Sequence, residues 1–444
     1  MKNCNVRDYG AMGDGVTLDT KAIQAAIDDC SANGGGRVIL EGGKFLTGRI
    51  DMKNGVDLHI ERDGMLLGST NVHDFPEIET DFWRTEYAPR FNRRCFIYAE
   101  GCEDIAITGR GKIDCQGRAY VRPMTEEEIR NRPNMSYLRL PMPLAEGEKP
   151  LDEATTMVGT APHPLDPRST SLAPARVVFF IGCKNVLVED ITMQNQPAGW
   201  SYWICDCHNV HFHRASIFAA VDMPNNDGIH INCCTNVTVS DCNISCGDDC
   251  VVVRAYSAPL HENKVCEKVT VTNCNFTSHA CAVRLGWIND GVIRNCTFSN
   301  LNITDTFSGL TAYLPGNPAD ARMSDEGFEA TLIENITFTN ITFDRNYSCP
   351  IRILIAEDNL CTGIRNLYFS NIHARSGKMP LVNGRADCHV ENIYFSDCHF
   401  TQVPYEEMGT KFSDRLARFG AKLDPVSFRY VDNLVLNSTS FTTL

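Results

Sequence analysis

The sequence has no long apolar run and no excess of positive charge. No stretch approaches the 18 apolar residues of a membrane-spanning helix, so no membrane partner is expected. The chain carries 55 acidic against 41 basic side chains, and its net charge of -14 argues against nucleic acid as a partner. The opening MKNCNVRDYGAMGDG lacks the apolar core of a signal peptide, which predicts a cytoplasmic protein.

Paired metal-binding cysteine motifs are missing as well. The chain has 21 cysteines, but no CxxC pair lies near a second one, which argues against a zinc site. In a cytoplasmic protein these cysteines are expected to be thiols rather than a disulfide framework. Several of them recur two residues before a repeated motif, which indicates small side chains that fill a narrow interior. These are Cys183, Cys207, Cys234 and Cys266.

The repeated motif is Asn, apolar, any, apolar, any, Asp or Asn, then Cys or Ile. It reads NVLVEDI at Asn185, NVTVSDC at Asn236 and NIYFSDC at Asn392, and GVIRNCTF at Gly291 fills the one long gap. Further copies begin at Asp104, Asn209, Lys268, Asn335, Asn366 and Asn433. Each copy is an alternating strand. Steps between neighbours of 24, 27, 32, 31 and 26 residues are too short for strand–helix–strand units. The pattern predicts an all-β chain folded as a parallel β-helix (solenoid), with one coil per repeat.

The two ends of the repeat array differ from its middle. The segment TLDTKAIQAAIDDCSANGGG has one apolar face, which predicts a helix over residues 19–32 with Asp19 or Thr20 as N-cap. A solenoid needs a cap on its first coil. We therefore expect an N-terminal capping helix within a cap region at residues 1–34.

Two further segments interrupt the expected single domain of residues 1–444. Residues 121–175 are rich in proline and acidic residues, which indicates a long loop insertion that serves either as a lid or as a plain surface loop. Residues 404–424 are expected to form a C-terminal helical segment that closes or flanks the last coils.

Three aspartates lie in two neighbouring repeats, within NNDGIHI and CGDDCVVV. Asp227 precedes Asp249 by 22 residues, which is one coil, so their side chains are expected about 5 Å apart in the stacking direction. The next coil offers SHACAV, which we align with Cys281 above Cys250 and His279 above Asp248. The sequence thus predicts that three carboxylates and an imidazole converge on one face.

Such a cluster has three interpretations. Asp and Asn beside glycine are common turn residues and form hydrogen-bonded ladders in solenoids. Clustered carboxylates also bind calcium. Carboxylates this close raise one another's pKa values, and a protonated acid beside an ionised one is what glycoside hydrolysis requires. The convergence of three acids with a histidine favours catalysis.

At these motifs the sequence resembles glycoside hydrolase family 28, the polygalacturonases and their relatives. The opening segment with GGGRVILEGGKFLTG, then ITGRGKIDCQG and NQPAGWSYWICDCHNVHF, are similar to the cap and coils of the pectin-lyase-like superfamily. The resemblance implies an inverting hydrolase on a right-handed parallel β-helix, with no metal and no cofactor. By motif position, Asp248 would be the general acid, Asp227 and Asp249 would hold and deprotonate the water, and His279 would support Asp248.

The sequence departs from the family where substrate is bound. The family's Gly-His-Gly reads SHA here, and its Arg-Ile-Lys, which holds a galacturonate carboxylate, has no match because the place reads FSGLTAY. Arg254 and Arg284 are candidate replacement cations, or ordinary arginines paired with local acids. Other candidate sugar contacts, each with a structural alternative, are Asn225, Asn226, Trp200, Tyr202, Trp203 and Trp287.

The expected function is therefore a polygalacturonase-like glycosidase that hydrolyses O-glycosidic bonds of pectin-derived or related oligosaccharides. A polysaccharide lyase or epimerase on the same scaffold is an alternative, and would use a lysine or arginine base and usually calcium. A non-catalytic carbohydrate-binding β-helix is a third possibility, although it would not need three adjacent acids.

Overall fold

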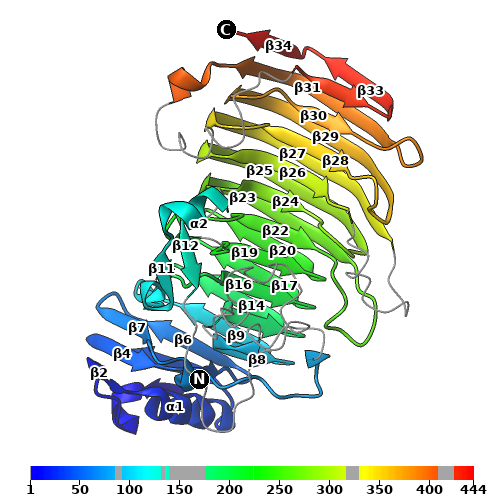
Figure 1. The fold of residues 1–444 in the computed structure, drawn as a ribbon. Helices are drawn as coiled ribbons and strands as arrows, with labels where there is room; N and C mark the ends of the chain where they lie inside the picture. Colours follow the sequence, from blue (N-terminus) through cyan, green and yellow to red (C-terminus); the bar gives the residue numbers. More distant parts are fainter. Residues whose placement is uncertain are drawn as a thin grey trace.

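The strand motifs of the sequence become neighbouring strands of two long parallel sheets. In this computed structural model the chain forms a parallel β-helix, which confirms the predicted all-β solenoid (Figure 1). The structure describes residues 2–85, 93–131, 136–139, 174, 176–223, 225–316, 330–408 and 425–444. No helix in these ranges is long and apolar enough to cross a membrane.

One sheet has 11 strands, and every strand in it pairs in parallel with its neighbours. In spatial order they are β5 (Ile50–Asp51), β8 (Cys95–Glu100), β13 (Arg176–Ile181), β16 (Trp200–Cys205), β19 (Ile229–Asn232), β22 (Val251–Arg254), β24 (Cys281–Leu285), β26 (Ser308–Leu314), β28 (Ile351–Ile355), β30 (Leu381–Asn383) and β32 (Ser427–Arg429).

The second sheet has 21 strands, because each coil supplies it with two strands or with one long bent strand. Its strands are β1 (Lys2–Asn5), β2 (Asp14–Leu18), β3 (Gly36–Leu40), β4 (Gly43–Thr47), β6 (Val56–Ile60), β7 (Gly64–Gly68), β9 (Glu103–Thr108), β10 (Lys112–Asp114), β14 (Lys184–Glu189), β15 (Thr192–Gln194), β17 (His208–His213), β18 (Ser216–Phe218), β20 (Thr235–Ser240), β21 (Asn243–Cys246), β23 (Cys266–Ser278), β25 (Val292–Thr306), β27 (Thr331–Asn346), β29 (Cys361–Ser376), β31 (Val390–Gln402), β33 (Val431–Asn437) and β34 (Ser440–Thr443). In β23, β25, β27, β29 and β31 the two shorter strands are continuous, with a bend between them, and they are separate again in β33 and β34.

The first residue of each motif copy turns the chain. Asn185, Asn209 and Asn236 have φ of 55°, 58° and 59°, a left-handed conformation that asparagine tolerates better than most residues. Their amides stack from coil to coil, and Asn209 Nδ2 donates to Asn185 Oδ1 at 2.8 Å. The copy expected at Gly291 in fact begins at Asn295, which has φ of 55° and whose amide oxygen accepts from Asn335.

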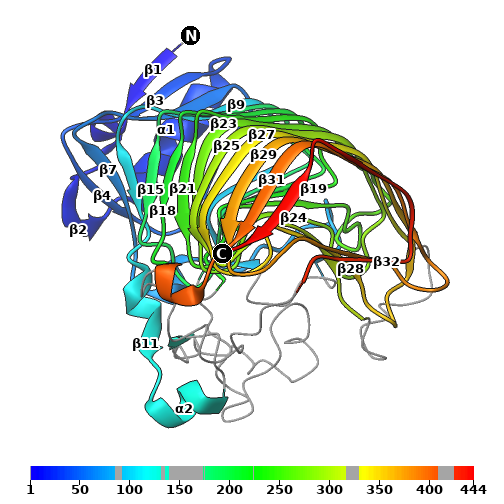
Figure 2. The same cartoon turned by 90° about the horizontal axis from the view of Figure 1, so that it is seen from above.

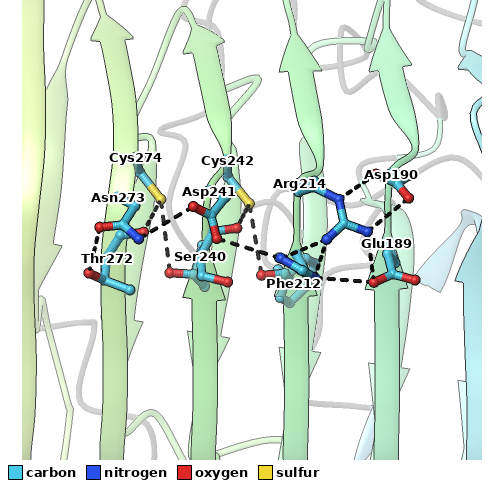
Figure 3. A network of polar contacts seen from close by, with 12 residues as sticks. Glu189, Asp190, Phe212, Arg214, Ser240, Asp241, Cys242, Thr272, Asn273 and Cys274 are labelled. Carbon is cyan, nitrogen blue, oxygen red and sulfur yellow. Dashed lines mark hydrogen bonds and ion pairs between the residues drawn. The ribbon is translucent and has the colours of Figure 1, made fainter.

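A second turn follows five residues later in each coil (Figure 3). Arg214 forms ion pairs with Asp190 in the previous coil, at 2.7 Å from Nε to Oδ1, and Asn273 donates to Asp241 at 3.3 Å. The Cys242 thiol donates to the carbonyl of Ser240 at 3.2 Å. Polar side chains outside and thiols inside therefore hold this bend in successive coils.

The predicted capping helix is present as α1 (Thr20–Ala32), with Asp19 as its N-cap residue. The Asp19 carboxylate accepts hydrogen bonds from the backbone of Met12 and Gly13 instead of capping the helix itself. Ile23 and Ile27 are fully buried on the first coil. Figure 1 shows α1 at the N-terminal end of the stack.

Only part of each interrupting segment lies in the described residues. The insertion begins with the antiparallel pair β11 (Val121–Pro123) and β12 (Tyr137–Arg139) and with α2 (Glu126–Asn131), which project from the body of the solenoid in Figure 2. Residues 140–173 of the insertion lie outside the described residues. In the predicted C-terminal helix, Tyr405–Met408 form a 3-10 turn and 409–424 lie outside the described residues.

The cysteines lie in the interior, as their recurrence in the repeat predicts. All 21 are free, and 20 of them are buried. Cys207 and Cys234 of neighbouring coils donate their S–H groups to backbone carbonyls, for example Cys234 Sγ to the Ile204 oxygen at 3.4 Å. Burial raises the pKa values of Cys207 and Cys234, which keeps both protonated and unreactive.

This packing predicts a large difference in thiol accessibility between the folded and unfolded protein. Because only Cys361 among the 21 is not fully buried, a thiol reagent should label about one cysteine in the native protein. After denaturation without reductant, the same reagent should label all 21. A much lower count in the denatured protein would mean that the cysteines form disulfides.

Candidate active site

The three aspartates lie on the two turns that lead into β19 and β22. Each turn needs a glycine. A Cβ on Gly228 would lie 2.2 Å from the Cys250 oxygen, and one on Gly247 would lie 2.1 Å from the Met223 oxygen. The close backbone contacts that these glycines permit place Asp227 and Asp249 side by side, with the Gly228 N–H donating to the Asp249 oxygen at 2.8 Å.

Strand register fixes which residues face one another. Ile229 pairs with Val251, so Asp227 is opposite Asp249, as the 22-residue step predicts. Val251 pairs with Val283, so Cys281 is opposite Asp249 and not opposite Cys250. The alignment that set His279 above Asp248 is therefore wrong by one residue, because backbone pairing and not the cysteines sets the step.

One carboxylate oxygen of each aspartate lies within 4.8 Å of the other two. This convergence is the arrangement that the motifs indicate. Inverting glycosidases generally separate the general acid from the water-holding carboxylate by about 6.5 to 9.5 Å, and the nearest oxygens of this cluster are closer than that. The separation is short because Asp227 and Asp249 lie on turns that lead into adjacent strands, about 5 Å apart, and Asp248 directly precedes Asp249.

Arg284, on β24, is the cation of the cluster. Its Nε donates to Asp249 Oδ2 and its Nη2 donates to Oδ1 at 3.2 Å, while the backbone N–H of Cys281 donates to Asp249 Oδ1 at 3.1 Å. Burial acts to raise the pKa of Asp249, but the charge and hydrogen bonds of Arg284 outweigh it and hold that pKa below the usual value. Asp249 is therefore a carboxylate.

Asp227 lies in the opposite electrostatic environment. Burial and the negative charge of Asp249 raise its pKa well above the usual value. Its Oδ2 lies 2.8 Å from Nε2 of His230. Burial, followed by the positive charge of Arg176, lowers the pKa of His230 well below the usual value. A neutral imidazole thus faces a carboxyl group that retains its proton.

A stack of three side chains supports this pair. The His230 ring is parallel to the ring of Trp200, with centroids 3.5 Å apart. The guanidinium carbon of Arg176 lies 3.4 Å from the Trp200 ring centre. Since β16 lies between β13 and β19, Arg176 and His230 cover opposite faces of the indole. Trp200 therefore has no free face on which a sugar could stack, contrary to expectation.

Asp248 is half-buried and is oriented by the turn of the preceding coil. The backbone and side-chain nitrogens of Asn225 lie 3.3 and 3.5 Å from its Oδ2. The Ser278 hydroxyl donates to the Asp248 carbonyl, which brings the turn that holds His279 to this residue. Asn226 is fully buried, and its amide oxygen accepts from the Gly247 N–H at 2.6 Å. Asn226 is thus a clamp between the two turns and not a sugar contact.

Of the remaining candidate sugar contacts, two are buried in the core and one is half-buried. Tyr202 is fully buried against Phe212, so the expectation that it contacts substrate is wrong. Trp203 is stacked on Phe179 at 4.4 Å and is also buried. Trp287 is half-buried, with the guanidinium of Arg284 at 4.6 Å from its ring centre.

Arg254 forms a buried ion pair and does not face the aspartate cluster as a free cation. Its Nε lies 2.8 and 2.7 Å from the two carboxylate oxygens of Asp290, whose side chain is fully buried. Asp290 also accepts from the backbone N–H groups of Ala255 and Trp287. Arg254 therefore anchors the loop that carries Trp287, and the ion-pair interpretation of this arginine is the correct one.

Comparisons with known proteins agree with this site. A family model described as "Glycosyl hydrolases family 28" matches residues 168–310, which contain all three aspartates, and "Rhamnogalacturonase A/epimerase, pectate lyase-like" matches residues 3–59. This part of the chain, residues 168–310, is similar to glycoside hydrolase family 28. The family match thus covers the turns around Asp227 and Asp249 and extends into β26.

Individual relatives are distant. A chain named "Probable polygalacturonase" from Vitis vinifera is 26% identical over 56% of this chain and 43% of its own length. An exo-poly-alpha-D-galacturonosidase from Dickeya chrysanthemi is 26% identical over 56% of this chain and 41% of its own length. This chain thus spans less than half of either relative. The fold matches the crystal structure of an exopolygalacturonase from Thermotoga maritima, with a TM-score of 0.69 at 23% identity, over 90% of this chain and 87% of that one.

Sequence reasoning missed His230 and Arg176 in this site. A signal for His230 was present, because it is the polar residue in the alternating strand GIHI, three residues after Asp227 and on the outward face. Arg176 gave no comparable signal, since it lies on β13, two strands before β19, and belongs to none of the motifs.

The ion pair between Arg284 and Asp249 predicts a shift in pH dependence. Replacing Arg284 by Met removes the charge that holds the pKa of Asp249 down, so that pKa should rise. If Asp249 must be ionised for activity, the limb on which kcat/KM falls with decreasing pH should move to higher pH by at least about one unit. Arg284→Lys should restore part of the shift. An unchanged acidic limb in Arg284→Met would show that Asp249 does not control it.

Proposed function

We propose that the protein is an inverting glycosidase that hydrolyses pectin-derived oligosaccharides. The observation that carries the proposal is the cluster of Asp227, Asp248 and Asp249 within 4.8 Å, in which Asp249 is held ionised and Asp227 is held protonated. The ionised carboxylate can act as a base, and the protonated carboxyl group beside it can hold the same water without adding a second negative charge.

The short separation is compatible with a single shared water. Two oxygens that each bind one water at about 2.7 Å can be up to about 5.4 Å apart. Oxygens of Asp227 and Asp249 that lie within 4.8 Å of each other can therefore hold the same molecule. Asp249 accepts the proton of this water as its oxygen attacks the anomeric carbon, and Asp227, which carries a proton, orients it. This differs from the sequence interpretation, in which both residues deprotonate the water.

Asp248 is the proposed general acid. It is the least buried of the three aspartates, and Asn225 positions its carboxyl group at the edge of the cluster. In the proposed step Asp248 gives its proton to the glycosidic oxygen while Asp249 takes one from water. The C–O bond breaks, the new hydroxyl enters from the opposite face, and His279 supports Asp248 from the adjoining turn.

The substrate class rests on the relatives and on charge. The two relatives compared above are named for polygalacturonase and galacturonosidase activities. In this chain the positive charges of Arg176 and Arg284 act on the aspartates and offset part of the negative charge that a carboxylate-bearing substrate would meet. We therefore favour a uronic substrate over a neutral one.

A calcium-dependent lyase is the second candidate, because the three aspartates could also hold a metal ion. Arg284 argues against it, since its guanidinium already occupies both oxygens of Asp249 and repels a cation. A chelator should leave the initial rate unchanged. Loss of activity with EDTA, restored by calcium together with an unsaturated product, would favour the lyase.

The general acid can be distinguished from the other aspartates with two substrates. Asp248→Asn should lower kcat on galacturonic acid oligosaccharides by about 10²- to 10⁴-fold, because the leaving oxygen is no longer protonated. On an aryl galacturonoside, whose leaving group needs no proton, the loss should be much smaller. Asp249→Asn should be equally impaired on both substrates, and Asp241→Asn, on the outer bend, serves as the control. Equal losses for Asp248→Asn on both substrates would remove its assignment as the acid.

A further inference from the structure

Beyond the aspartates, a row of outward-facing side chains continues across three strands. In the 11-stranded sheet Arg284 pairs with Thr311, and Thr311 pairs with Arg352 on β28. Arg352 is thus in the same row as Arg284, two strand spacings away, or about 10 Å. The residues on either side of it, Ile351 and Ile353, are buried in the core, so Arg352 points away from the core.

Aromatic rings connect the two arginines. The guanidinium of Arg284 lies 4.6 Å from the ring centre of Trp287, and that of Arg352 lies 4.4 Å from the ring centre of Tyr313. Trp287 and Tyr313 contact each other edge to face, with centroids 5.6 Å apart. A half-buried strip, in which the two rings lie between the two arginines, therefore extends from Asp249 to Arg352.

The arginines in this region differ in whether a carboxylate of the protein neutralises them. Arg284 is neutralised by Asp249, and Arg254 by Asp290. Among the described residues, Arg352 has no carboxylate partner, and its guanidinium packs on the Tyr313 ring. Because it is packed against an aromatic face, its planar guanidinium is held in place with its N–H donors available for a fork-like contact with a carboxylate.

We propose that Arg352, on the platform of Tyr313 and Trp287, binds the carboxylate of a uronic acid unit that neighbours the scissile bond. This subsite rests on the proposed function and deepens it. It supplies the cation that the substrate needs, because Arg284 and Arg254 are occupied by Asp249 and Asp290. The subsite also explains how the chain can take an acidic oligosaccharide although its aspartate cluster is itself negatively charged.

Kinetics on a matched pair of substrates test this subsite. The substrates are a galacturonic acid oligosaccharide and its fully methyl-esterified form, in which every carboxylate is replaced by a neutral ester. For Arg352→Gln we expect KM on the acidic substrate to rise by about 10- to 100-fold, with a much smaller change on the ester. Arg352→Lys should be intermediate, because it keeps the charge but loses the fork. Arg365→Gln, on β29 of the other sheet, is the control.

The possible outcomes distinguish failure of the proposed subsite from failure of the proposed function. If the wild type hydrolyses the acidic substrate and Arg352→Gln changes KM equally little for both forms, the subsite is wrong and the proposed function stands. If KM rises equally for both forms, Arg352 acts on structure and the carboxylate contact is wrong. If the wild type cleaves neither form, the proposed function is overturned, and the subsite with it.

Discussion

The site depends on one constraint, the backbone pairing of adjacent coils. Hydrogen bonds between β19, β22 and β24 fix Asp227, Asp249 and the N–H of Cys281 in one row across the sheet. Because the backbone positions in this row are fixed, only rotation of the side chains can change the distance between them. Two buried carboxyl groups are therefore held together, and the surrounding residues must compensate the repulsion that would follow if both were ionised.

Two different partners provide this compensation. Arg284 supplies a positive charge to Asp249, whereas His230, kept neutral by burial and by Arg176, supplies only a hydrogen bond to Asp227. One carboxyl group is thereby stabilised in the charged form and the other in the protonated form. The Trp200 ring lies between Arg176 of β13 and His230, and its contact with His230 helps to fix the imidazole beside Asp227. Aspartates of the same chemical type thus acquire different roles from their environments.

The fold could be predicted from the sequence because its determinants are local. Asparagines such as Asn185 mark a left-handed turn at the start of each strand, and their spacing gives the coil length directly. The aspartate cluster could be predicted for the same reason. The position of His279 could not, because the turn before β24 pairs one residue away from the apparent match. The core position of Tyr202 and the covered faces of Trp200 depend on side-chain packing, which a one-dimensional pattern does not contain.

The central claim is a single displacement by a water held between Asp227 and Asp249. The most direct measurement is proton NMR of the first product released from an α-linked galacturonic acid oligosaccharide, recorded before the anomers equilibrate. The account predicts that the β-anomer appears first and the α-anomer only later, by mutarotation. Initial release of the α-anomer would mean that a carboxylate attacks the sugar, and would contradict the account.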